Sequence, residues 1–475
     1  MNSNQSFNCP IIQTYQKLIN EIPDELKNLT YAVYPDNSTY NDDRFIYNKL
    51  FNYFPHAIFY PENEDQVSYL ILSLVKFNLE FSIRCGGHSY EPASLSEGYI
   101  ISMDNFSYIN IDDKNMTVKV GSGVRLGNLI DMLAEKNFIT PTGTSPCVGV
   151  SGLSLAGGKG LLTRLHGMTC DNIVSVRMID ALGKIIQVNA NSYPDLLWAI
   201  KGSGVCNYGL ITEIELKIFP DEFCQITTIK WDWDKSKIKK ILELYQRWSQ
   251  TSPYFITTDI NMNWNYTQST FSIKFIKFFI NKSNSLEENI YFEEINDFIN
   301  LYEPTITTCS GYYSKITDCW VDYQEGQYPC FSKMKSTMVF EPINSCGLDV
   351  MIKAIDDLVK TQPAQFFQIN LSQLGGQVIN GQSSYFPKNA IYVISIFNQW
   401  NSQNINKEAI DYTNKVYKNL FRYTSKYCFP NLIDYEIVNY LDAYYGSNAP
   451  ILINIKTKFD PNNIFKWKQS IPVKK

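Results

Sequence analysis

The alternation of apolar and polar positions divides the chain into two regions of different texture. Up to about residue 220, short apolar runs typical of strands alternate with glycine-rich turns and with short amphipathic helices, such as one predicted over 64–78. From about 225 to 425, glycine becomes rare, and longer strand-like runs alternate with longer amphipathic helices. The second pattern predicts a sheet backed by helices, folded separately from the first region.

The periodicity also places individual elements. In the second region, strands are predicted at 225–233, 256–264 and 270–280. Helices are predicted where apolar residues recur every three or four positions, at 236–248, 285–300, 348–360 and 406–422. In the first region, a hairpin is predicted from 173–179 to 184–188.

The first region holds a glycine pair directly after a predicted strand. An alternating run that ends at Ile83 leads into Arg84-Cys85-Gly86-Gly87-His88-Ser89-Tyr90. Adjacent glycines let the backbone turn sharply and bring N–H groups close to a ligand, which suits a diphosphate. His88, at the tip of the turn, is one of only three histidines in the chain. The glycine pair therefore makes His88 a candidate binding residue.

A second glycine-rich segment follows, with six glycines among the eighteen residues from Gly143 to Gly160. It has few charges and no repeat, which indicates backbone wrapped closely around a ligand and not a flexible linker. The preceding stretch 121–127 reads GxGxxxG and lacks the acidic residue of a dinucleotide-binding turn. A GxSxG nucleophile motif is not satisfied around Gly149 and Gly152 either. The segment therefore predicts a ligand site, but neither a Rossmann fold nor a serine hydrolase.

Composition narrows the classes of protein to which this chain can belong. The 475 residues, 44% of them hydrophobic, allow two or more domains. A net charge of −5 leaves no basic surplus for nucleic acid, and no apolar run is long enough to cross a membrane. Three dispersed histidines disfavour a zinc enzyme. The eleven cysteines include no CxxC pair, and the first residues show no signal-peptide pattern, so we expect mostly reduced thiols in a cytoplasmic-type, reducing compartment.

Short motifs also follow one another in a recognisable order at the two ends of the chain. They are Arg84–Tyr90, Gly143–Gly160, Arg164–Gly167 with Asp171-Asn172, Asp195–Trp198 with Gly202-Ser-Gly204, and, in the tail, Tyr444–Asn448, Ile455-Lys456, Asp460–Phe465 and Gln469–Ile471. With this order and spacing over about 50–220 and 425–471, the chain resembles the FAD-linked oxidases with a PCMH-type FAD-binding domain, in the berberine-bridge-enzyme-like and sugar-oligosaccharide-oxidase group. The residues between these two ends resemble the family mainly in position.

The resemblance implies an α+β fold. Its parts are a PCMH-type FAD-binding domain of two subdomains and an α+β substrate domain with an antiparallel sheet backed by helices. The chain is expected to divide into a lead-in at 1–50, the FAD-binding domain at 51–222, the substrate-binding domain at 223–425, and a C-terminal segment at 426–475 that returns to the FAD-binding domain. The FAD is expected between the two subdomains, closed in by the tail.

The resemblance also implies which residues hold FAD. His88 matches the histidine that binds the flavin covalently in this group, a bond that raises the redox potential. Many relatives add a bond from a cysteine, but that position is Ser145 here and Cys147 lies two residues later; a single bond through His88 is expected, and a second through Cys147 stays open. Val148 falls beside the flavin ring, where valine goes with oxygen access in relatives. The other expected cofactor contacts are Gly86, Gly87, Ser89, Gly149, Gly152, Gly157, Gly158, Asp171, Asn172, Gly204, Gly209, Ile211, Asn431, Tyr445 and Asn448.

The implied reaction moves a hydride from a carbinol carbon of an alcohol or sugar to flavin N5, while a base takes the hydroxyl proton and O₂ becomes H₂O₂. In relatives the base is a tyrosine, but that position holds Phe429, which cannot accept a proton. Tyr427 and His166 are the alternative bases, and a histidine has a suitable pKa without special tuning. Gln368 and Asn370 are expected to hydrogen-bond the substrate.

Two other functions stay open at the level of sequence. The same fold serves dehydrogenases and cyclising oxidases of secondary metabolites, which differ in substrate or electron acceptor. The phenylalanine at position 429 also leaves open a flavin-binding protein with weak catalysis. The expectation is nevertheless an FAD-linked oxidase acting on CH–OH groups, with a small molecule and O₂ as its partners and with no nucleic-acid or membrane partner.

Overall fold

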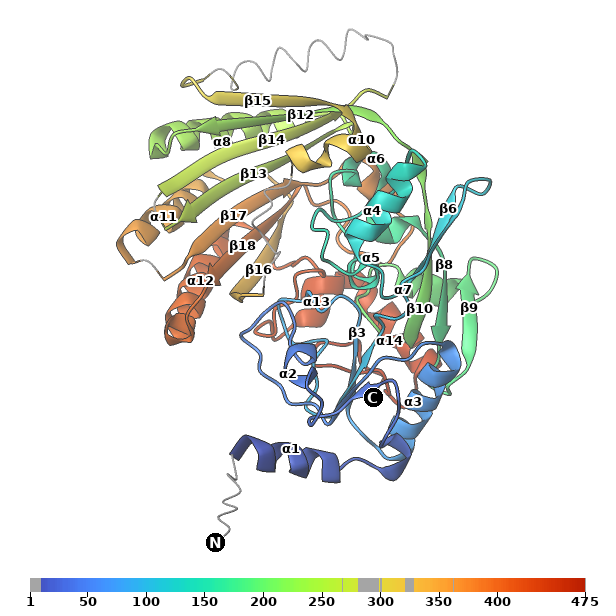
Figure 1. The fold of residues 1–475 in the computed structure, drawn as a ribbon. Helices are drawn as coiled ribbons and strands as arrows, with labels where there is room; N and C mark the ends of the chain where they lie inside the picture. The colour runs from blue at the N-terminus through green and yellow to red at the C-terminus, as the bar shows by residue number, and fades with distance from the viewer. Residues whose placement is uncertain are drawn as a thin grey trace.

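The computed structural model describes residues 10–266, 268–280, 299, 301–320, 329–361 and 363–474. These residues form a four-stranded, a five-stranded and a seven-stranded sheet, together with a two-stranded pair of β7 (Phe138–Ile139) and β11 (Phe219–Pro220). In Figure 1 the seven-stranded sheet lies at the upper left, the five-stranded sheet at the right and the four-stranded sheet below. The fold is α+β, as expected.

The four-stranded sheet is mostly parallel and has the order β1-β2-β4-β3. Its strands are β1 (Ala32–Val33), β2 (Ala57–Phe59), β3 (Phe81–Arg84) and β4 (Tyr99–Ser102), and the helices of this part are α1 (Pro10–Asn20), α2 (Tyr40–Asp43) and α3 (Glu64–Lys76). Helix α3 is capped by Asn63, whose side chain accepts a hydrogen bond from the backbone N–H of Gln66. One face of α3 then packs on the sheet, in the core that also holds Phe59 and Ile101.

The five-stranded sheet is antiparallel, with the order β5-β6-β10-β8-β9. Its strands are β5 (Ile109–Asp112), β6 (Thr117–Gly121), β8 (Ile173–Ile179), β9 (Ile185–Asn189) and β10 (Leu210–Lys217). The helices that follow these strands in the chain are α4 (Leu126–Glu135), α5 (Val150–Leu155), α6 (Thr163–His166) and α7 (Pro194–Ile200). Strands β8 and β9 form the predicted hairpin.

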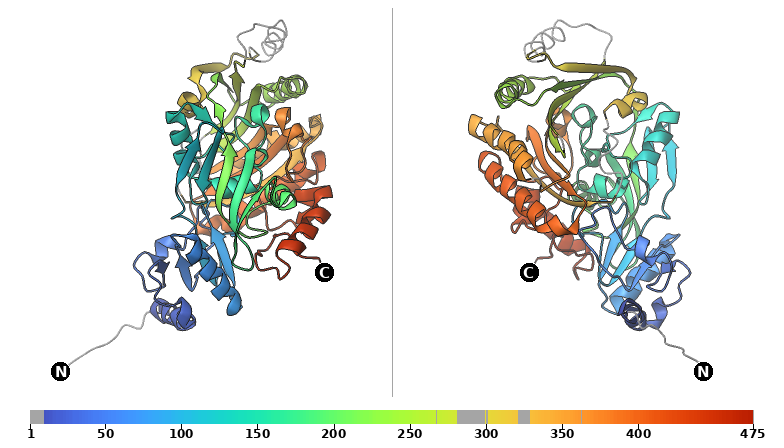
Figure 2. Two further views of the ribbon diagram at one scale, coloured as in Figure 1. Left: turned by 90° about the vertical axis from the view of Figure 1, so that its right-hand side faces the viewer. Right: turned by 60° about the vertical axis from the view of Figure 1, so that its left-hand side comes forward.

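The seven-stranded sheet is antiparallel and has the order β15-β12-β14-β13-β17-β18-β16. Its strands are β12 (Phe223–Trp231), β13 (Ile256–Asn265), β14 (Gln268–Phe278), β15 (Thr305–Tyr312), β16 (Phe331–Val339), β17 (Phe366–Gln373) and β18 (Tyr392–Trp400). Helices α8 (Lys235–Ser249), α11 (Ser345–Thr361) and α12 (Asn406–Leu420) cover its outer face, while the short α10 (Tyr313–Ile316) follows β15 (Figure 2). The predicted helices at 236–248, 348–360 and 406–422 are thereby confirmed, and most of the one predicted at 285–300 lies outside the described residues.

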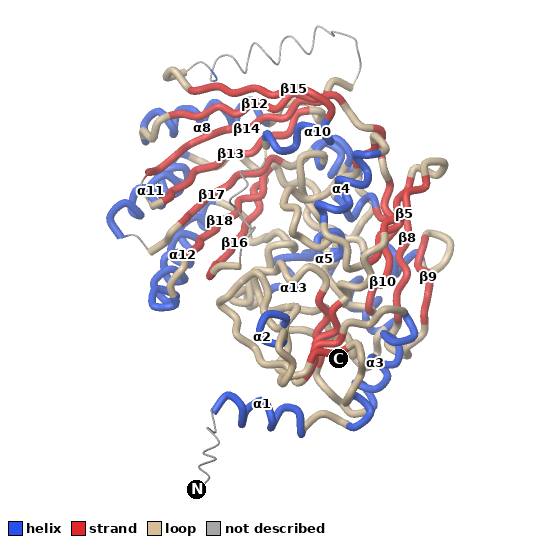
Figure 3. The backbone as a smooth tube through the Cα atoms, viewed as in Figure 1, coloured by secondary structure: helices blue, strands red, loops and turns tan. Residues whose placement is uncertain are grey.

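The inner face of the seven-stranded sheet looks toward the rest of the molecule. Figure 3 shows that much of the backbone between this sheet and the other two is loop. The chain returns to this region at its C-terminal end through α13 (Tyr440–Tyr445) and α14 (Ala449–Phe459), whose buried residues belong to the core of the five-stranded sheet. Within the described residues, no helix is long and apolar enough to cross a membrane.

Candidate functional site

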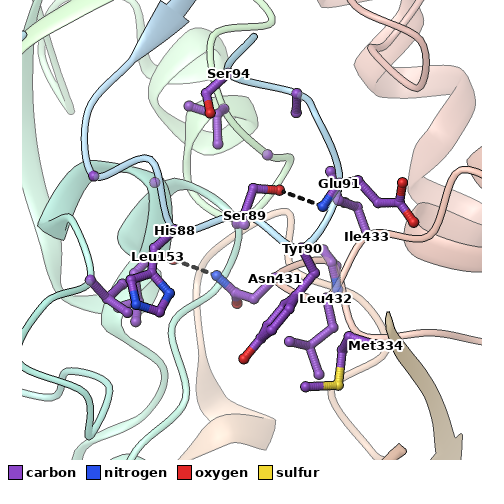
Figure 4. A pocket seen from close by; sticks show the side chains of 18 of the residues that line it. His88, Ser89, Tyr90, Glu91, Ser94, Leu153, Met334, Asn431, Leu432 and Ile433 are labelled. Atoms are coloured by element: carbon purple, nitrogen blue, oxygen red, sulfur yellow. Dashed lines mark hydrogen bonds between the residues drawn. The ribbon is translucent and has the colours of Figure 1, made fainter. Parts of the chain in front are cut away.

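A cavity of about 830 Å³ lies where the glycine-rich segments face the seven-stranded sheet. Its walls come from the turn after β3, the segment 143–159, the inner face of the sheet, and the tail segments 429–435 and 464–468. Figure 4 shows part of this wall, where the turn around His88 comes close to the tail around Asn431. Small-molecule and cofactor pockets have volumes of roughly 300–1,000 Å³, so this cavity can hold a large organic ligand.

The two glycine-rich segments touch each other at the cavity wall. A Cβ added to Gly86 would lie 2.4 Å from the backbone nitrogen of Gly149, and one added to Gly149 would lie 2.7 Å from the nitrogen of Gly86. Gly87 has a φ of +61°, a conformation that favours glycine. The turn is therefore specified by glycine at each of these three positions, as the sequence indicated.

His88 is held at the cavity wall by an aromatic neighbour. Its ring stacks on that of Tyr47, with centroids 4.2 Å apart and an angle of 14° between the planes. The backbone N–H of Tyr47 also donates to the carbonyl of Gly87 at 2.9 Å. Tyr47 thus fixes both the backbone of the turn and the imidazole, and an imidazole placed at a cavity wall can act as a nucleophile toward a bound ligand.

The wall next to His88 fits a phosphate-containing cofactor such as FAD. A Cβ added to Gly152 would meet no atom within 4 Å, so bare backbone faces open space there. The hydroxyl of Ser94 is buried at the wall and has no hydrogen-bond partner among the described residues. Buried hydroxyls are nearly always satisfied, so this one points to a ligand oxygen. Ser89 and Ser145 add two more hydroxyls to the same wall.

Asn431 joins the tail to the second glycine-rich segment. Its side-chain oxygen accepts from the backbone N–H of Gly158 at 2.8 Å, and its amide donates to the carbonyl of Leu153 at 2.9 Å (Figure 4). Tyr445 also lines the cavity, and its hydroxyl donates to the carbonyl of Ser203 at 2.8 Å. The tail is therefore part of the cavity wall and is fastened to it by specific hydrogen bonds.

The structure brings most of the predicted residues to this cavity. Those that line it are Gly86, Gly87, His88, Ser89, Ser145, Val148, Gly149, Gly152, Gly204, Gln368, Asn370, Asn431 and Tyr445. Those that do not line it are Cys147, Gly157, Gly158, His166, Asp171, Asn172, Gly209, Ile211, Tyr427 and Asn448. The second group needs a separate explanation.

Several residues of the second group support the wall from behind. Gly158 has a φ of +78°, and a Cβ there would lie 2.3 Å from the hydroxyl oxygen of Thr169. The carboxylate of Asp171 accepts hydrogen bonds from Ser383 and from the backbone of Met168. The amide of Asn172 donates to two carbonyl groups of the same loop. The contacts of Gly158, Asp171 and Asn172 shape the glycine-rich segment. None of the three residues lines the cavity, so the structure does not support their predicted contact with the cofactor.

Cys147 is exposed and does not line the cavity, whereas Ser145 does. The expectation that both side chains point the same way assumed an extended strand, but residues 144–148 form a bend and turn. The geometry therefore gives no support to a second flavin bond through Cys147.

Tyr427 also lies away from the cavity. Its ring packs edge-on against Phe386 and Phe340, with centroid distances of 5.0 and 5.9 Å. Phe429 lines the cavity instead. Residues 427–429 are not in a strand, so the two-residue alternation that placed Tyr427 beside position 429 does not apply. A role for Tyr427 as the base is not supported.

His166 is the third residue that the structure places elsewhere. It is the last residue of α6, and its ring stacks on Phe219 with centroids 3.8 Å apart and an angle of 14° between the planes. Its Nε2 is buried without a hydrogen-bond partner among the described residues. Burial lowers the pKa of His166 to about 4 from 6.5. The ring behaves as a buried aromatic group, and its predicted catalytic role is not supported.

The lowered pKa of His166 makes stability depend on pH. Between pH 6.5 and about 4, the unfolded chain binds a proton that the folded protein does not, so the free energy of unfolding falls as the pH falls. At pH 5 this amounts to about 2 kcal/mol. We expect His166→Phe, which can keep the stacking on Phe219, to lose correspondingly less stability than the wild type between pH 7.5 and 5.0. Urea denaturation at the two pH values measures this, and an equal loss in both proteins would contradict the interpretation.

The sheet side of the cavity carries rows of polar side chains. In register across β17, β13 and β14 lie Ser372, Asp259 and Lys274, and in the next row Asn370 and Asn261. The amide of Asn370 donates to the Asn261 side-chain oxygen at 2.9 Å, and the hydroxyl of Ser372 donates to the Asn370 oxygen at 2.7 Å. The face that was predicted from Gln368 and Asn370 is therefore part of a wider hydrogen-bonded surface.

Asp259 and Lys159 are the main site residues that the sequence analysis missed. The strand around Asp259 alternates Asp259, Asn261 and Asn263 with apolar Ile260, Met262 and Trp264, a period of two that could have identified a polar face. Lys159 comes from the glycine-rich segment on the other side, and its ammonium donates to the hydroxyl of Ser372 at 2.5 Å. Nothing in the spacing of the sequence could have brought Lys159 to the sheet.

Two buried groups lock the sheet to the rest of the site. The guanidinium of Arg164 donates to the carbonyls of Ile256, Ser252, Pro253 and Leu374. Burial lowers the pKa of Arg164 to about 10. The hydrogen bonds span from α6, which follows the glycine-rich segment, to the ends of β13 and β17, so they hold the two walls of the cavity at a fixed separation.

The second locking group is a cluster of charges around Lys333 and Lys335 of β16, all of them buried except Glu436. The ammonium of Lys333 lies 2.8 Å from both Glu91 and Asp434, and that of Lys335 lies 2.6 Å from Asp434 and Glu436. Burial acts to raise the pKa of Asp434, but Lys333 and Lys335 outweigh it and hold that pKa below its usual value. Burial raises the pKa of Glu91 in spite of Lys333. The cluster joins the glycine turn, the sheet and the tail.

The cysteines differ in one respect from the expected free thiols. Cys309 and Cys319 form a disulfide beside Trp320, which lines the cavity, while eight other described cysteines are free. The sequence separation of 10 residues gives no pattern from which the pairing could be predicted. No group of His, Cys, Asp or Glu side chains in the described part of the chain could hold a metal ion.

Comparison with known proteins agrees with this site. The family model described as "FAD binding domain" matches residues 55–189, and the one described as "Berberine and berberine like" matches residues 428–472. The chain is 27% identical over 449 residues to the uncharacterized FAD-linked oxidoreductase YgaK of Bacillus subtilis (strain 168). The aligned region covers 92% of this chain and 95% of that protein.

Solved structures agree as well. BBE-like 1 of Physcomitrella patens superposes with a TM-score of 0.82 at 25% identity, over 94% of this chain and 97% of that one. A chitooligosaccharide oxidase superposes with a TM-score of 0.83 over 98% of this chain and 100% of that one, and at 18% identity this likeness concerns the fold alone. Both matched domains flank the cavity described above, so the chain carries an FAD-binding domain and a berberine-like domain and is similar throughout to FAD-linked oxidoreductases of the berberine-bridge-enzyme-like group.

Proposed function

We propose that the protein is an oxidase that removes a hydride from a carbinol carbon of a sugar or similar polyol. The observation that carries the proposal is the polar sheet wall of the cavity, where Gln368, Asn370, Asn261, Ser372 and Asp259 face the FAD side. Hydrogen-bonding side chains in rows suit a substrate with several hydroxyl groups, because each hydroxyl both donates and accepts. An apolar metabolite would shield these polar groups from water without offering them hydrogen bonds, which costs binding energy.

The FAD side of the cavity supports an oxidase. When bound, FAD accepts the hydride at N5 and passes the electrons to O₂, which yields H₂O₂. Val148 lines the cavity at the position that the family resemblance places beside the flavin, and a valine there goes with oxygen access. We also propose that residues 51–222 and 426–475 form the FAD-binding domain and that 223–425 form the substrate-binding domain.

We further propose that His88 holds the FAD through one covalent bond. The stacking on Tyr47 fixes the imidazole at the cavity wall, and the glycine turn keeps the neighbouring wall clear of side chains. Cys147 is exposed and outside the cavity lining, which favours a single bond over two.

The function is tested by mixing the purified yellow protein with cellobiose, D-glucose, sorbitol and, as an aromatic alcohol, 4-hydroxybenzyl alcohol. The proposal expects a sugar or polyol to bleach the flavin without oxygen and to produce one H₂O₂ per O₂ consumed when oxygen is present. Bleaching without reoxidation by O₂ would indicate a dehydrogenase. A preference for the aromatic alcohol would contradict the polyol assignment, and a flavin that no alcohol bleaches would point to a binding protein.

A further inference from the structure

An alcohol oxidase needs a group that takes the hydroxyl proton, and the residues first considered do not supply one. Phe429 cannot accept a proton, and Tyr427 and His166 lie outside the cavity lining. Charged side chains line the part of the cavity that is bounded by the seven-stranded sheet. In the described part of the chain these are Asp259 on β13, Lys274 on β14, and Lys159 from the facing glycine-rich segment.

Asp259 lies at the centre of this group. Its neighbours in register are Ser372 on β17 and Lys274 on β14, and Tyr245 of α8 lies behind it as a buried phenol. The side chain of Asp259 is 17% exposed, and its Oδ1 is 4.0 Å from the ammonium nitrogen of Lys159. At this distance the two charges attract, yet the gap is wider than a hydrogen bond. The carboxylate and the ammonium thus flank a common point at the wall.

The two lysines near Asp259 are held differently. Lys274 is buried and donates to the carbonyl of Trp320 at 2.7 Å, so it secures the segment that follows the disulfide. Lys159 reaches across the cavity and donates to Ser372. Because Lys159 lies on the glycine-rich segment of the FAD side, its ammonium and Asp259 meet where the cofactor side and the substrate side of the cavity come together.

Other carboxylates at the cavity are less suited to the task. Glu91 is buried and lies 2.8 Å from the ammonium of Lys333, in the charge cluster that joins the turn to β16. Glu80 is exposed and precedes β3, on the opposite side of the cavity from the sheet. Among the described carboxylates that line the cavity, only Asp259 combines partial burial with a position among the polar rows that would hold a polyol.

We infer that Asp259 is the proton acceptor of this site and that Lys159 binds the oxygen of the reacting hydroxyl, an inference that rests on the proposed oxidase function. In the reaction the O–H bond breaks and its proton passes to the Asp259 carboxylate. The electron pair left on oxygen forms the C=O bond, and the hydride leaves the carbinol carbon for the bound FAD, which is reduced by two electrons. The Lys159 ammonium stabilises the negative charge that develops on the oxygen.

The test compares Asp259→Asn and Lys159→Met with the wild type by stopped-flow bleaching of the flavin with cellobiose in the absence of oxygen. Asp259→Asn keeps the shape of the side chain, so we expect the protein to fold and to keep its flavin spectrum. The bleaching rate is expected to fall by about 10²–10⁴-fold, the usual contribution of a general base. Lys159→Met is expected to lower it by about 10²–10³-fold, as for a lost oxyanion donor. In Asp259→Asn, the cellobiose concentration that gives the half-maximal rate should change much less than the bleaching rate itself does.

A pH profile separates a base from a structural residue. The bleaching rate is measured as a function of pH for the wild type and for Asp259→Asn, and the two profiles are expected to differ in shape. Asp356→Asn is the matched control, because Asp356 lies on α11, behind the sheet, where it accepts from Trp233 at 2.8 Å. It should bleach at the wild-type rate with the wild-type pH profile.

The outcomes distinguish the two proposals. If the wild type is bleached and Asp259→Asn is bleached as fast, with the same pH dependence, the role of Asp259 is overturned while the oxidase function stands. If no alcohol in the panel bleaches the wild type, the oxidase function is overturned, and so is the role of Asp259 as its proton acceptor.

Discussion

An H88A variant is expected to release all of its flavin into the supernatant when the protein is precipitated with acid, while the wild-type pellet stays yellow after washing. Acid unfolding destroys every non-covalent contact with FAD, so only a covalent bond keeps the flavin in the pellet. His88 is the one predicted nucleophile that the structure places at the cavity wall, with its ring against Tyr47. The measurement is the absorbance of pellet and supernatant near 450 nm.

Cys147→Ser is the matched control for this experiment. Cys147 is exposed and outside the cavity lining, so the variant should hold its flavin in the pellet as the wild type does. Yellow pellets from H88A would mean that another residue bonds to the flavin, and loss of colour in both H88A and Cys147→Ser pellets would mean that formation of the attachment depends on both side chains. Flavin that leaves the wild-type pellet would refute covalent attachment altogether.

The second large effect is expected for Lys456→Met, which should lower the free energy of unfolding by about 3–5 kcal/mol. Lys456 of α14 and Asp460, which caps the C-terminal end of that helix, are an ion pair with no exposed side-chain surface and an N–O distance of 2.7 Å. The ammonium also donates to the carbonyls of Asn207 and Phe465, both at 2.6 Å. Burial lowers the pKa of Lys456, and the neighbouring Asp460 opposes this shift. Methionine would leave the Asp460 carboxylate buried without its counter-charge.

Lys458→Met offers a control two residues further along the same helix. Lys458 pairs with Asp195 at 2.7 Å, but the two side chains are 62% and 41% exposed. Solvent screens such a pair, so its loss should change stability by less than about 1 kcal/mol. Urea midpoints of the flavin-loaded proteins measure both variants, since bound ligand contributes to apparent stability. Equal urea midpoints for Lys456→Met and Lys458→Met would show that burial of the ion pair does not determine how much stability its loss costs.

The secondary structure and the glycine turns were predictable because their causes are local. The alternation in 256–264 and the apolar stripe of 236–248 depend only on periods of two and 3.6 residues, and both elements formed. Gly86 and Gly149 could be recognised in the sequence because their backbones lie so close to each other that any side chain at either position would clash. Family resemblance, and not periodicity, supplied Gln368 and Asn370.

The parts that could not be predicted depend on contacts between distant segments. Lys159 meets Ser372 across more than two hundred residues of sequence, and only the fold brings them together. His166 has the chemistry of a base, but its place against Phe219 is decided by tertiary packing. Tyr427 and Cys147 were placed by assuming extended backbone, and the turns that replace it direct their side chains elsewhere.

The cavity wall has a consequence for the order of events during synthesis. Residues 464–468 line the same cavity as Gly86 and His88, and Lys456 ties their segment to the core through Phe465. A ribosome makes the glycine turn long before it makes residues 464–468. The nascent chain therefore carries an open half-site until residues 464–468 have left the exit tunnel, and only then can the cavity enclose a ligand.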